Sequence, residues 1–254
     1  MNLQMGLVLL LSTAAYVGVG IAVGIRLVRL ARKTRGFPER MLGWSALVGP
    51  GLVAPSMVVV MAISEPAAVV RGAAVVSQLA YATFCALLVA FTCQCFRPDD
   101  GWARWLSRAV VATALAGAAV GCARALGLAP IADLRDLNHW AFRLISFAVL
   151  VGNVWTAAES LSYYARMQKR RLIGLADPVV TNRFLLWGLV GLGAVTATGV
   201  PMVVSLMGGD SFNDVPTRLV GAAATILGSV CLQLAFLPPQ SYVAWVKRRA
   251  AAAA

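Results

Sequence analysis

Charged residues are scarce in this chain of 254 residues, since lysine, arginine, aspartate and glutamate make up only 13% of it. A soluble domain carries about 25% of such residues. The deficit is deepest for acids, with 10 aspartates and glutamates against 22 lysines and arginines. Hydrophobic residues make up 60% of the chain, and the mean hydropathy is +0.79. This composition excludes an ordinary soluble domain and predicts a protein that lies in a lipid bilayer.

Histidine is nearly absent, because His139 is the only one. One histidine cannot supply the paired axial ligands of a transmembrane b-type haem, and no metal-ligand spacing is present. The sequence also lacks a phosphate-binding glycine loop and a zinc-protease helix. We therefore expect no metal, no haem cofactor and no enzyme activity.

The cysteines give no sign of a disulfide framework. All five fall within apolar runs, and none lies in a predicted outside loop. We interpret them as small buried hydrophobic residues. They are Cys85, Cys93, Cys95, Cys122 and Cys231.

Seven apolar runs are long enough to cross a hydrocarbon core, which takes about 20 residues of helix. Backbone polar groups have no water partner in lipid, so each run is predicted to be a helix. We therefore expect an all-α polytopic membrane protein with one domain over residues 1–254. The runs are Met5 to Ile25, Met41 to Ile63, Ala73 to Phe96, Ala109 to Leu128, Ala141 to Ala165, Phe184 to Met207 and Leu219 to Leu237.

The basic residues predict the orientation of the chain. Most of them follow the first, third, fifth and seventh runs. Positive residues collect on the cytoplasmic side, so we expect the N-terminus outside and the C-terminus in the cytoplasm. The residues on the predicted cytoplasmic side are Arg26, Arg29, Arg32, Lys33, Arg35, Arg40, Arg97, Arg104, Arg108, Arg166, Lys169, Arg170, Arg171, Arg183, Lys247, Arg248 and Arg249.

The net charge of +12 is thus mainly a signal of topology, and it does not predict nucleic-acid binding. We expect these residues to contact anionic headgroups of the inner leaflet. Arg170, Arg171 and Arg183 form the candidate contact with lipid or with a cytoplasmic protein. The short loops and the alanine, valine and arginine content are typical of a bacterial inner-membrane protein.

Residues recur at an offset of 140. The aromatic, proline and arginine residues around the end of the third run recur around the end of the seventh. Arg26 and Pro38 likewise match Arg166 and Pro178. This pattern predicts a tandem parallel repeat, with repeat A over about residues 5–108, a linker helix over about 109–128 and repeat B over about 141–249. The recurring marks are Phe96, Pro98, Trp102, Trp105 and Arg108, matched by Phe236, Pro238, Tyr242, Trp245 and Arg248.

This arrangement resembles that of SWEET-type sugar transporters at the level of topology alone. Their characteristic helix prolines are expected in the first and fifth spans, whereas Pro50, Pro55 and Pro201 stand in the second and sixth. The predicted order also resembles that of seven-helix receptors and retinal proteins. A retinal Schiff base needs a lysine in the last span, and that span has none. We therefore exclude retinal and assign no family.

Polar residues gather in the fifth span. His139, Ser146, Asn153 and Ser160 recur every seven residues and form a stripe along one helix face. This stripe is typical either of a ligand or solvent path or of hydrogen bonds between helices. His139, at the outer boundary, is also compatible with simple interfacial placement.

Other polar residues stand inside or at the ends of the spans. Gln78 and Gln233 are candidates for binding a ligand or lining its path, and they are also interpreted as partners across the bundle. Arg143 is expected to reach the interface, to pair with an outside aspartate or to bind an anion. Pro50, Pro55 and Pro201 are candidate hinges that free carbonyl groups, unless packing alone explains them. Asn182 is expected to cap the sixth helix.

Glu159 is the single acid well inside a predicted span. An ionised carboxylate there is costly unless it is paired, and such a residue is a functional candidate. The alternative is a structural ion pair with a juxtamembrane arginine such as Arg40, Arg166 or Arg183.

Three functions fit the sequence. A carrier or facilitator of a small solute or lipid-like ligand fits the predicted repeat and the proline-broken helices best. A seven-helix receptor or sensor with a separate cytoplasmic partner is the second. A structural subunit of a membrane complex is the third.

Overall fold

The computed structural model describes residues 3–134, 136, 139–209 and 214–251. Within these residues, seven helical segments are long and apolar enough to cross a membrane, which confirms the predicted number. Arg135 and Asp210, two of the charges in the predicted outer loops, lie outside the described residues. The segments are Gly6–Thr34, Phe37–Ala62, Ala67–Phe96, Gly101–Leu128, Trp140–Leu172, Pro178–Leu206 and Val215–Phe236.

Two of these segments contain an irregular turn. The second consists of α2 and α3 joined by a π-helical turn at Gly49–Val53, and the fourth ends in a similar turn at Arg124–Leu128. The helices are α1 (Leu3–Thr34), α2 (Phe37–Val48), α3 (Ala54–Ala62), α4 (Ala67–Phe96), α5 (Gly101–Ala123), α6 (Ile131–Leu134), α7 (Trp140–Leu172), α8 (Pro178–Leu206), α9 (Val215–Phe236) and α10 (Gln240–Ala251).

Several helices extend beyond the apolar runs that predicted them, because caps and turns set their ends. The side chain of Asp177 accepts from the backbone nitrogens of Val179 and Val180 at the start of α8. The expectation that Asn182 caps this helix was therefore wrong, and Asn182 instead donates to the hydroxyl of Tyr242. Asp214 caps α9 in the same way as Asp177 caps α8.

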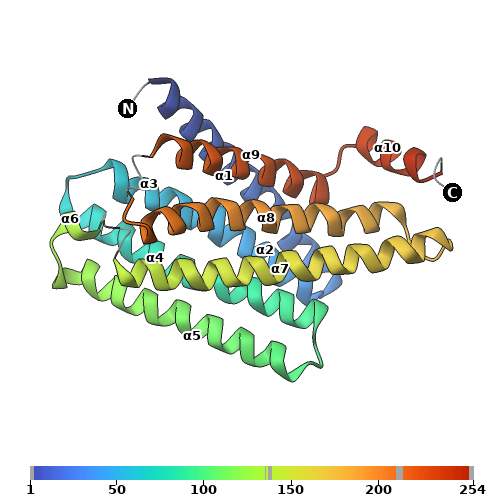
Figure 1. The fold of residues 1–254 in the computed structure, drawn as a ribbon, viewed down its shortest axis with the longest axis horizontal. Helices are drawn as coiled ribbons and strands as arrows, with labels where there is room; N and C mark the ends of the chain where they lie inside the picture. The colour runs from blue at the N-terminus through green and yellow to red at the C-terminus, as the bar shows by residue number, and fades with distance from the viewer. Residues whose placement is uncertain (1–2, 135, 137–138, 210–213, 252–254) are drawn as a thin grey trace.

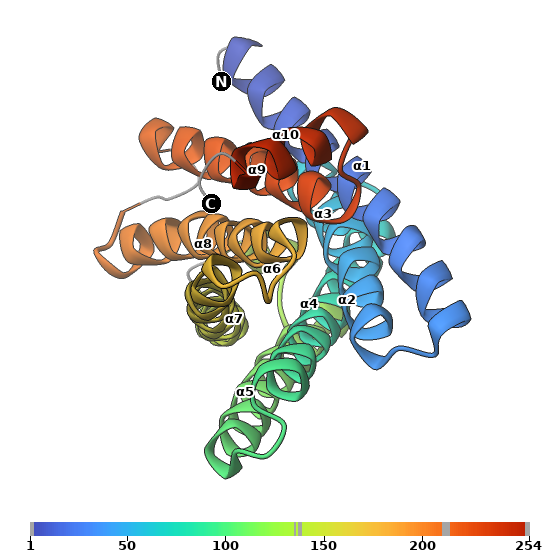
Figure 2. The same cartoon turned by 90° about the vertical axis from the view of Figure 1, so that its right-hand side faces the viewer.

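The helices form a ring in chain order (Figures 1 and 2). Each span packs against the next, and α1 closes the ring against α9. α4 also packs against α7, which leaves α5 outside the ring, against α4 and α7. We call the end where α1, α4, α7 and α9 begin the N face, and the end where they finish the C face. The described chain begins near the N face and finishes near the C face (Figure 1).

Small residues allow the close approach of helices in both halves. An ideal Cβ on Gly20 of α1 would lie 2.3 Å from Cγ of Pro50, and one on Gly24 would lie 2.7 Å from Cγ of Leu47. In α8, a Cβ on Gly191 would lie 2.9 Å from that of Ala157. These contacts are the small-residue packing that joins helices in membranes, where burial from water does not drive their association.

The largest cluster of buried residues lies where α5 packs against α4 and α7. A cluster of buried residues from α4, α5 and α7 includes Cys85, Ala114 and Ile145, all with no exposed surface. A second cluster lies in the C-face half of the ring and joins α1, α2, α4 and α9 around Val23 and Leu232. The ring is thus packed shut toward the C face.

Candidate functional site

A cavity of about 630 Å³ lies inside the ring. It is lined by residues of α1, α2, α3, α4, α7, α8 and α9 and of the π-helical turn between α2 and α3. Among the described residues, α5 contributes none to this lining. This size is typical of pockets that hold small organic molecules, so the ring has room for a ligand.

Four aromatic residues close the cavity toward the C face, and we call them the aromatic floor: Phe91, Phe96, Trp187 and Phe236. Trp187 lines the cavity, and its ring centroid lies 5.9 Å from that of Phe91 and 5.7 Å from that of Phe236. The Phe91 and Phe96 rings meet edge to face at 6.1 Å. Such edge contacts stabilise the cluster beyond simple burial. The floor joins α4, α8 and α9.

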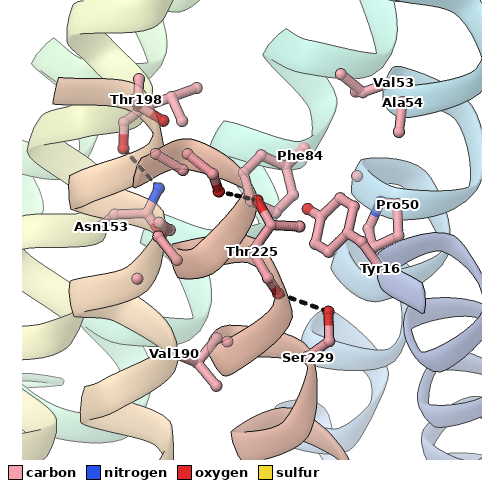
Figure 3. Close-up of a pocket in the computed structure, with 18 of the residues that line it drawn as sticks. Tyr16, Pro50, Val53, Ala54, Phe84, Asn153, Val190, Thr198, Thr225 and Ser229 are labelled. Carbon is pink, nitrogen blue, oxygen red and sulfur yellow. Dashed lines mark hydrogen bonds between the residues drawn. The ribbon is translucent and has the colours of Figure 1, made fainter. Parts of the chain in front are cut away.

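The walls are largely apolar and carry scattered hydroxyl and amide groups (Figure 3). Asn153 is only 5% exposed, and its side-chain nitrogen donates to the carbonyl oxygen of Val149 at 2.8 Å. The hydroxyl groups of Thr225 and Ser229 donate to carbonyl oxygens of their own helix, each at 2.8 Å. The two hydroxyl donors are therefore satisfied inside the protein, and their oxygen atoms remain as acceptors for a ligand. The amide of Asn153 offers its oxygen as an acceptor and its second N–H as a donor. Tyr16 reaches into the same space from α1.

At the N face the cavity ends beside two arginines, Arg143 of α7 and Arg218 of α9. The Nη2 atom of Arg143 donates to the carbonyl oxygen of Ser205 at 3.2 Å and to its hydroxyl at 3.1 Å. Its Nε atom is buried and has no hydrogen-bond partner among the described residues. Asp214, at the start of α9, is engaged by the backbone nitrogen and hydroxyl of Thr217.

The predicted polar stripe of α7 is divided between two roles. Ser146 and Asn153 line the cavity. Ser160 is fully buried at the level of the aromatic floor and is not part of the lining. His139 precedes α7, and its Nδ1 accepts from the backbone nitrogen of Ala141 at 3.2 Å. Burial, with a smaller effect of the Arg124 charge, lowers the pKa of His139, which keeps this cap in its neutral form.

Glu159 lies outside the cavity, in the interface of α7 with α4. Its side chain is 7% exposed, and Oε1 accepts from Nε of Arg97 at 2.8 Å. This contact is the expected ion pair with a juxtamembrane arginine, but the arginine is Arg97 and not Arg40, Arg166 or Arg183. Arg97 directly follows α4 and also contacts Asp100 at 3.3 Å. The hydrogen bond that Arg97 donates to Glu159 raises the pKa of Arg97, so this arginine stays charged.

The expectation that Gln78 and Gln233 face each other was wrong. The side chain of Gln78 lies against α5, because an ideal Cβ on Gly121 would lie 2.6 Å from its Cδ. Gln233 is exposed on the outside of α9. The error arose because a polar residue in an apolar run was expected to face the bundle, whereas Gln233 lies only three residues from the end of its helix.

The candidate hinge prolines lie in three environments. Pro50 is buried in the π-helical turn and lines the cavity, and Pro201 lines it from within α8. Pro55 is exposed near the start of α3. A proline removes one backbone donor and leaves a carbonyl without its helical partner, which explains the widened turn at Pro50. Two of the three prolines are thus placed at the cavity.

The basic candidates for lipid or partner contact lie at the C face. Arg170 and Arg171 stand in the last turn of α7, and Arg183 is exposed in the second turn of α8. Arg170 is exposed and Arg171 is half-buried. They lie outside the cavity lining, so any contact that they make is separate from a ligand in the ring.

Sequence reasoning did not predict most of the lining, because serine, threonine and tyrosine are common in membrane helices and their direction depends on how the helices pack. The signal that it did use, a seven-residue period, found Ser146 and Asn153. Within the described residues, histidine, cysteine, aspartate and glutamate do not gather in a group of three or more that would hold a metal ion. Comparisons of the chain with protein-family models, curated proteins and solved structures gave no match.

Proposed function

We propose that this protein binds a small, mainly apolar solute in the central cavity and carries it across the membrane. The observation that carries the proposal is a cavity of about 630 Å³ whose lining runs from Arg143 and Arg218 near the N face to Trp187 of the aromatic floor. A carrier presents its site to one side of the membrane at a time. A cavity that ends at the aromatic floor on the side of the C face fits such a state.

The packing of the helices supports a carrier built from two equivalent units. In a two-unit arrangement, α1 corresponds to α7, the span of α2 and α3 corresponds to α8, and α4 corresponds to α9. Exchanging the two units then turns the contact of α1 with α9 into a contact of α7 with α4. Both contacts occur, and α5 is the helix left over. The ends of α4 and α9 also match, since the next residue has φ −142° and ψ 51° in one case and φ −129° and ψ 46° in the other.

We further propose that the N face lies outside the cell and the C face in the cytoplasm of a bacterium. The N-terminal end of the cavity would then take up solute from outside. The positive residues after α1, α4 and α7 support this orientation.

A receptor is the second candidate, and one observation favours it. The helices follow one another around the ring in chain order, and the cavity is sealed from the basic C face by the aromatic floor. A ligand that only shifted the floor would pass a signal to a partner without crossing the membrane. Flux is therefore the quantity that separates the two functions.

The test fills the cavity without disturbing the fold. An ideal Cβ on Gly228 of α9 meets nothing within 4 Å, and Gly228 lines the cavity. Gly72 of α4 also has open space around its Cβ, but it is exposed and outside the lining. Gly228→Leu therefore places a side chain in the cavity, whereas Gly72→Leu places one on the outer surface. The two variants form a matched pair.

Proteoliposomes that hold each variant are loaded with a panel of small apolar carboxylates, alcohols and amines, and release is followed over time. We expect the wild type and Gly72→Leu to release at least one member at the same rate and Gly228→Leu to be at least tenfold slower. A ligand that raises the thermal midpoint of the wild type without any flux supports the receptor. Equal flux through Gly228→Leu and the wild type contradicts transport through this cavity.

A further inference from the structure

We infer that the ligand is an amphiphilic anion whose carboxylate binds Arg143 and whose apolar chain extends into the cavity toward Trp187. The inference rests on the proposed function, because it assigns a chemical class to the solute of the same cavity. It comes from the distribution of charge along the cavity. Arginine occurs at the N-face end, and the lining otherwise consists of neutral side chains among the described residues.

Arg143 carries a charge that the described protein does not neutralise. It lies in the first turn of α7, three residues after Trp140, and it lines the cavity. It makes no ion pair with an acid among the described residues. Charged groups at such depth are normally paired or placed in a functional site. Among the described residues, Arg143 therefore has no anionic partner.

The guanidinium group retains donors for this anion. Nη2 is held by Ser205, which fixes the plane of the group between α7 and α8. Nη1 makes no hydrogen bond to the described residues, and Nε is buried without one. Carboxylates accept hydrogen bonds from guanidinium groups in a fork, and these charge-assisted bonds are stronger than neutral ones. Because Arg143 donates to Ser205 through Nη2, a carboxylate could accept a hydrogen bond from Nη1.

The surroundings favour an anion over a cation. Arg218 lines the same end of the cavity, and acidic side chains are absent from the described lining. Asp214, the nearest acid in the chain to this helix end, is a cap whose carboxylate accepts from Thr217. Phe84, in the middle of α4, belongs to the lining, and the cavity continues to Trp187 at the floor. A polar head and an apolar body thus match the two ends of one cavity.

The test compares three probes that share an eight-carbon chain and differ in the head: octanoate, 1-octanol and octylammonium. The full-length protein is placed in phosphatidylcholine nanodiscs, and binding is measured by calorimetry against empty nanodiscs. We expect octanoate to bind at least tenfold more tightly than 1-octanol, and octylammonium to bind most weakly. Gly228→Leu should weaken all three probes alike.

Variants of Arg143 test whether its positive charge causes the preference for octanoate over 1-octanol. Arg143→Gln should weaken octanoate about tenfold and change 1-octanol by less than about twofold, whereas Arg143→Lys should keep a preference for octanoate. Arg71→Gln is the control, because Arg71 lies on α4 near the same face and outside the cavity lining. If Arg143→Gln does not fold, the ratio of the affinities for octanoate and 1-octanol in the wild type and in Arg143→Lys still tests whether the site prefers an anion.

An anionic head can come from a free solute or from a bilayer lipid. Replacing half of the phosphatidylcholine by phosphatidylglycerol should leave octanoate binding unchanged if the site takes free carboxylates, and should weaken it if lipid headgroups compete at Arg143. Equal binding of octanoate and 1-octanol, with both lost in Gly228→Leu, overturns the anion inference and leaves the cavity as a binding site. Binding of all probes that is unaffected by Gly228→Leu contradicts the proposed function as well.

Discussion

Glu159 and Arg97 join two helices at the C-face end of the ring. Glu159 is buried in α7, and the Arg97 side chain, 36% exposed, lies over the Trp102 ring with its Cζ 5.8 Å from the centroid. One level further in, the hydroxyl groups of Thr92 and Thr156 meet at 2.7 Å between the same two helices. These polar contacts hold α4 against α7 beside the aromatic floor. The pair therefore stabilises the closed end of the cavity.

The ion pair makes an asymmetric prediction about thermal stability. Arg97→Gln leaves the Glu159 carboxylate buried without its cation, so we expect the thermal midpoint to fall by several degrees. Glu159→Gln removes the buried charge itself and keeps an acceptor for Arg97, so its effect should be smaller. Thermal unfolding of both variants in the same detergent measures the difference.

Asp100→Asn serves as the control for this experiment, because Asp100 is 40% exposed and its contact with Arg97 is a surface pair. Its midpoint should lie within about 1 °C of the wild type. Equal losses for Arg97→Gln and Asp100→Asn would show that the buried carboxylate does not need its partner.

The sequence singled out Glu159 but not its partner. An acid in an apolar run is visible in the sequence alone, and its cost in lipid marks it. Arg97 belongs to the end of α4, and its distance to Glu159 depends on the register between two helices that no local pattern encodes. The seven-residue period is a local pattern, and it identified Asn153 as a lining residue. The direction in which the Gln233 side chain points depends on helix packing, and the prediction for it was wrong.

At the scale of elements, the contact of α1 with the turn at Pro50 is the closest between the first two spans. The ring of Pro50 occupies the space that a side chain on Gly20 would need. The proline breaks in the second and sixth spans were visible in the sequence. The widened turn at Gly49–Val53 was not, because a proline in a helix can produce a kink or a bulge depending on its neighbours.

Two glycines of α1 test this contact. In Gly20→Ala the new Cβ would lie 2.3 Å from Cγ of Pro50, so we expect a loss of about 1–3 kcal/mol in the free energy of unfolding. In Gly18→Ala the new Cβ meets nothing within 4 Å, and alanine favours the helix by up to about 1 kcal/mol. Denaturant unfolding in mixed micelles, followed by tryptophan fluorescence, measures both changes.

Opposite signs for the two alanine variants are the expected pattern. A Gly20→Ala protein that is as stable as Gly18→Ala would mean that α1 and the Pro50 turn separate easily. The turn would then be the natural hinge of the first half of the ring, and its packing would contribute little to stability.

For the whole molecule, composition and run length predicted an all-α protein with seven helices long and apolar enough to span a membrane, and the described residues confirm both. They did so because each apolar run must satisfy its own backbone in lipid. The ring and its cavity were not predictable, because they depend on which faces of the helices meet. Glycines such as Gly20 and Gly191 set those approaches, and their meaning became visible only with their neighbours in place.

The orientation of the ring decides from which side a ligand enters, and it gives the last prediction. The five native cysteines are replaced by alanine, and one cysteine is then introduced at Ser64, between α3 and α4, or at Asp99, between α4 and α5; both positions are exposed. A membrane-impermeant maleimide added to intact cells should label Ser64→Cys, and it should label Asp99→Cys only after the cells are opened. This is the outcome expected from the proposed orientation, in which the basic residues after α1, α4 and α7 lie in the cytoplasm.

The two positions control for each other, since each must react fully once the membrane is opened. The reverse pattern would place Arg143 and the entrance of the cavity in the cytoplasm. The same cavity would then receive its ligand from inside the cell, and the carrier would work as an exporter. Labelling of both positions in intact cells would show that α4 does not cross the membrane, which would remove the basis for a sealed ring.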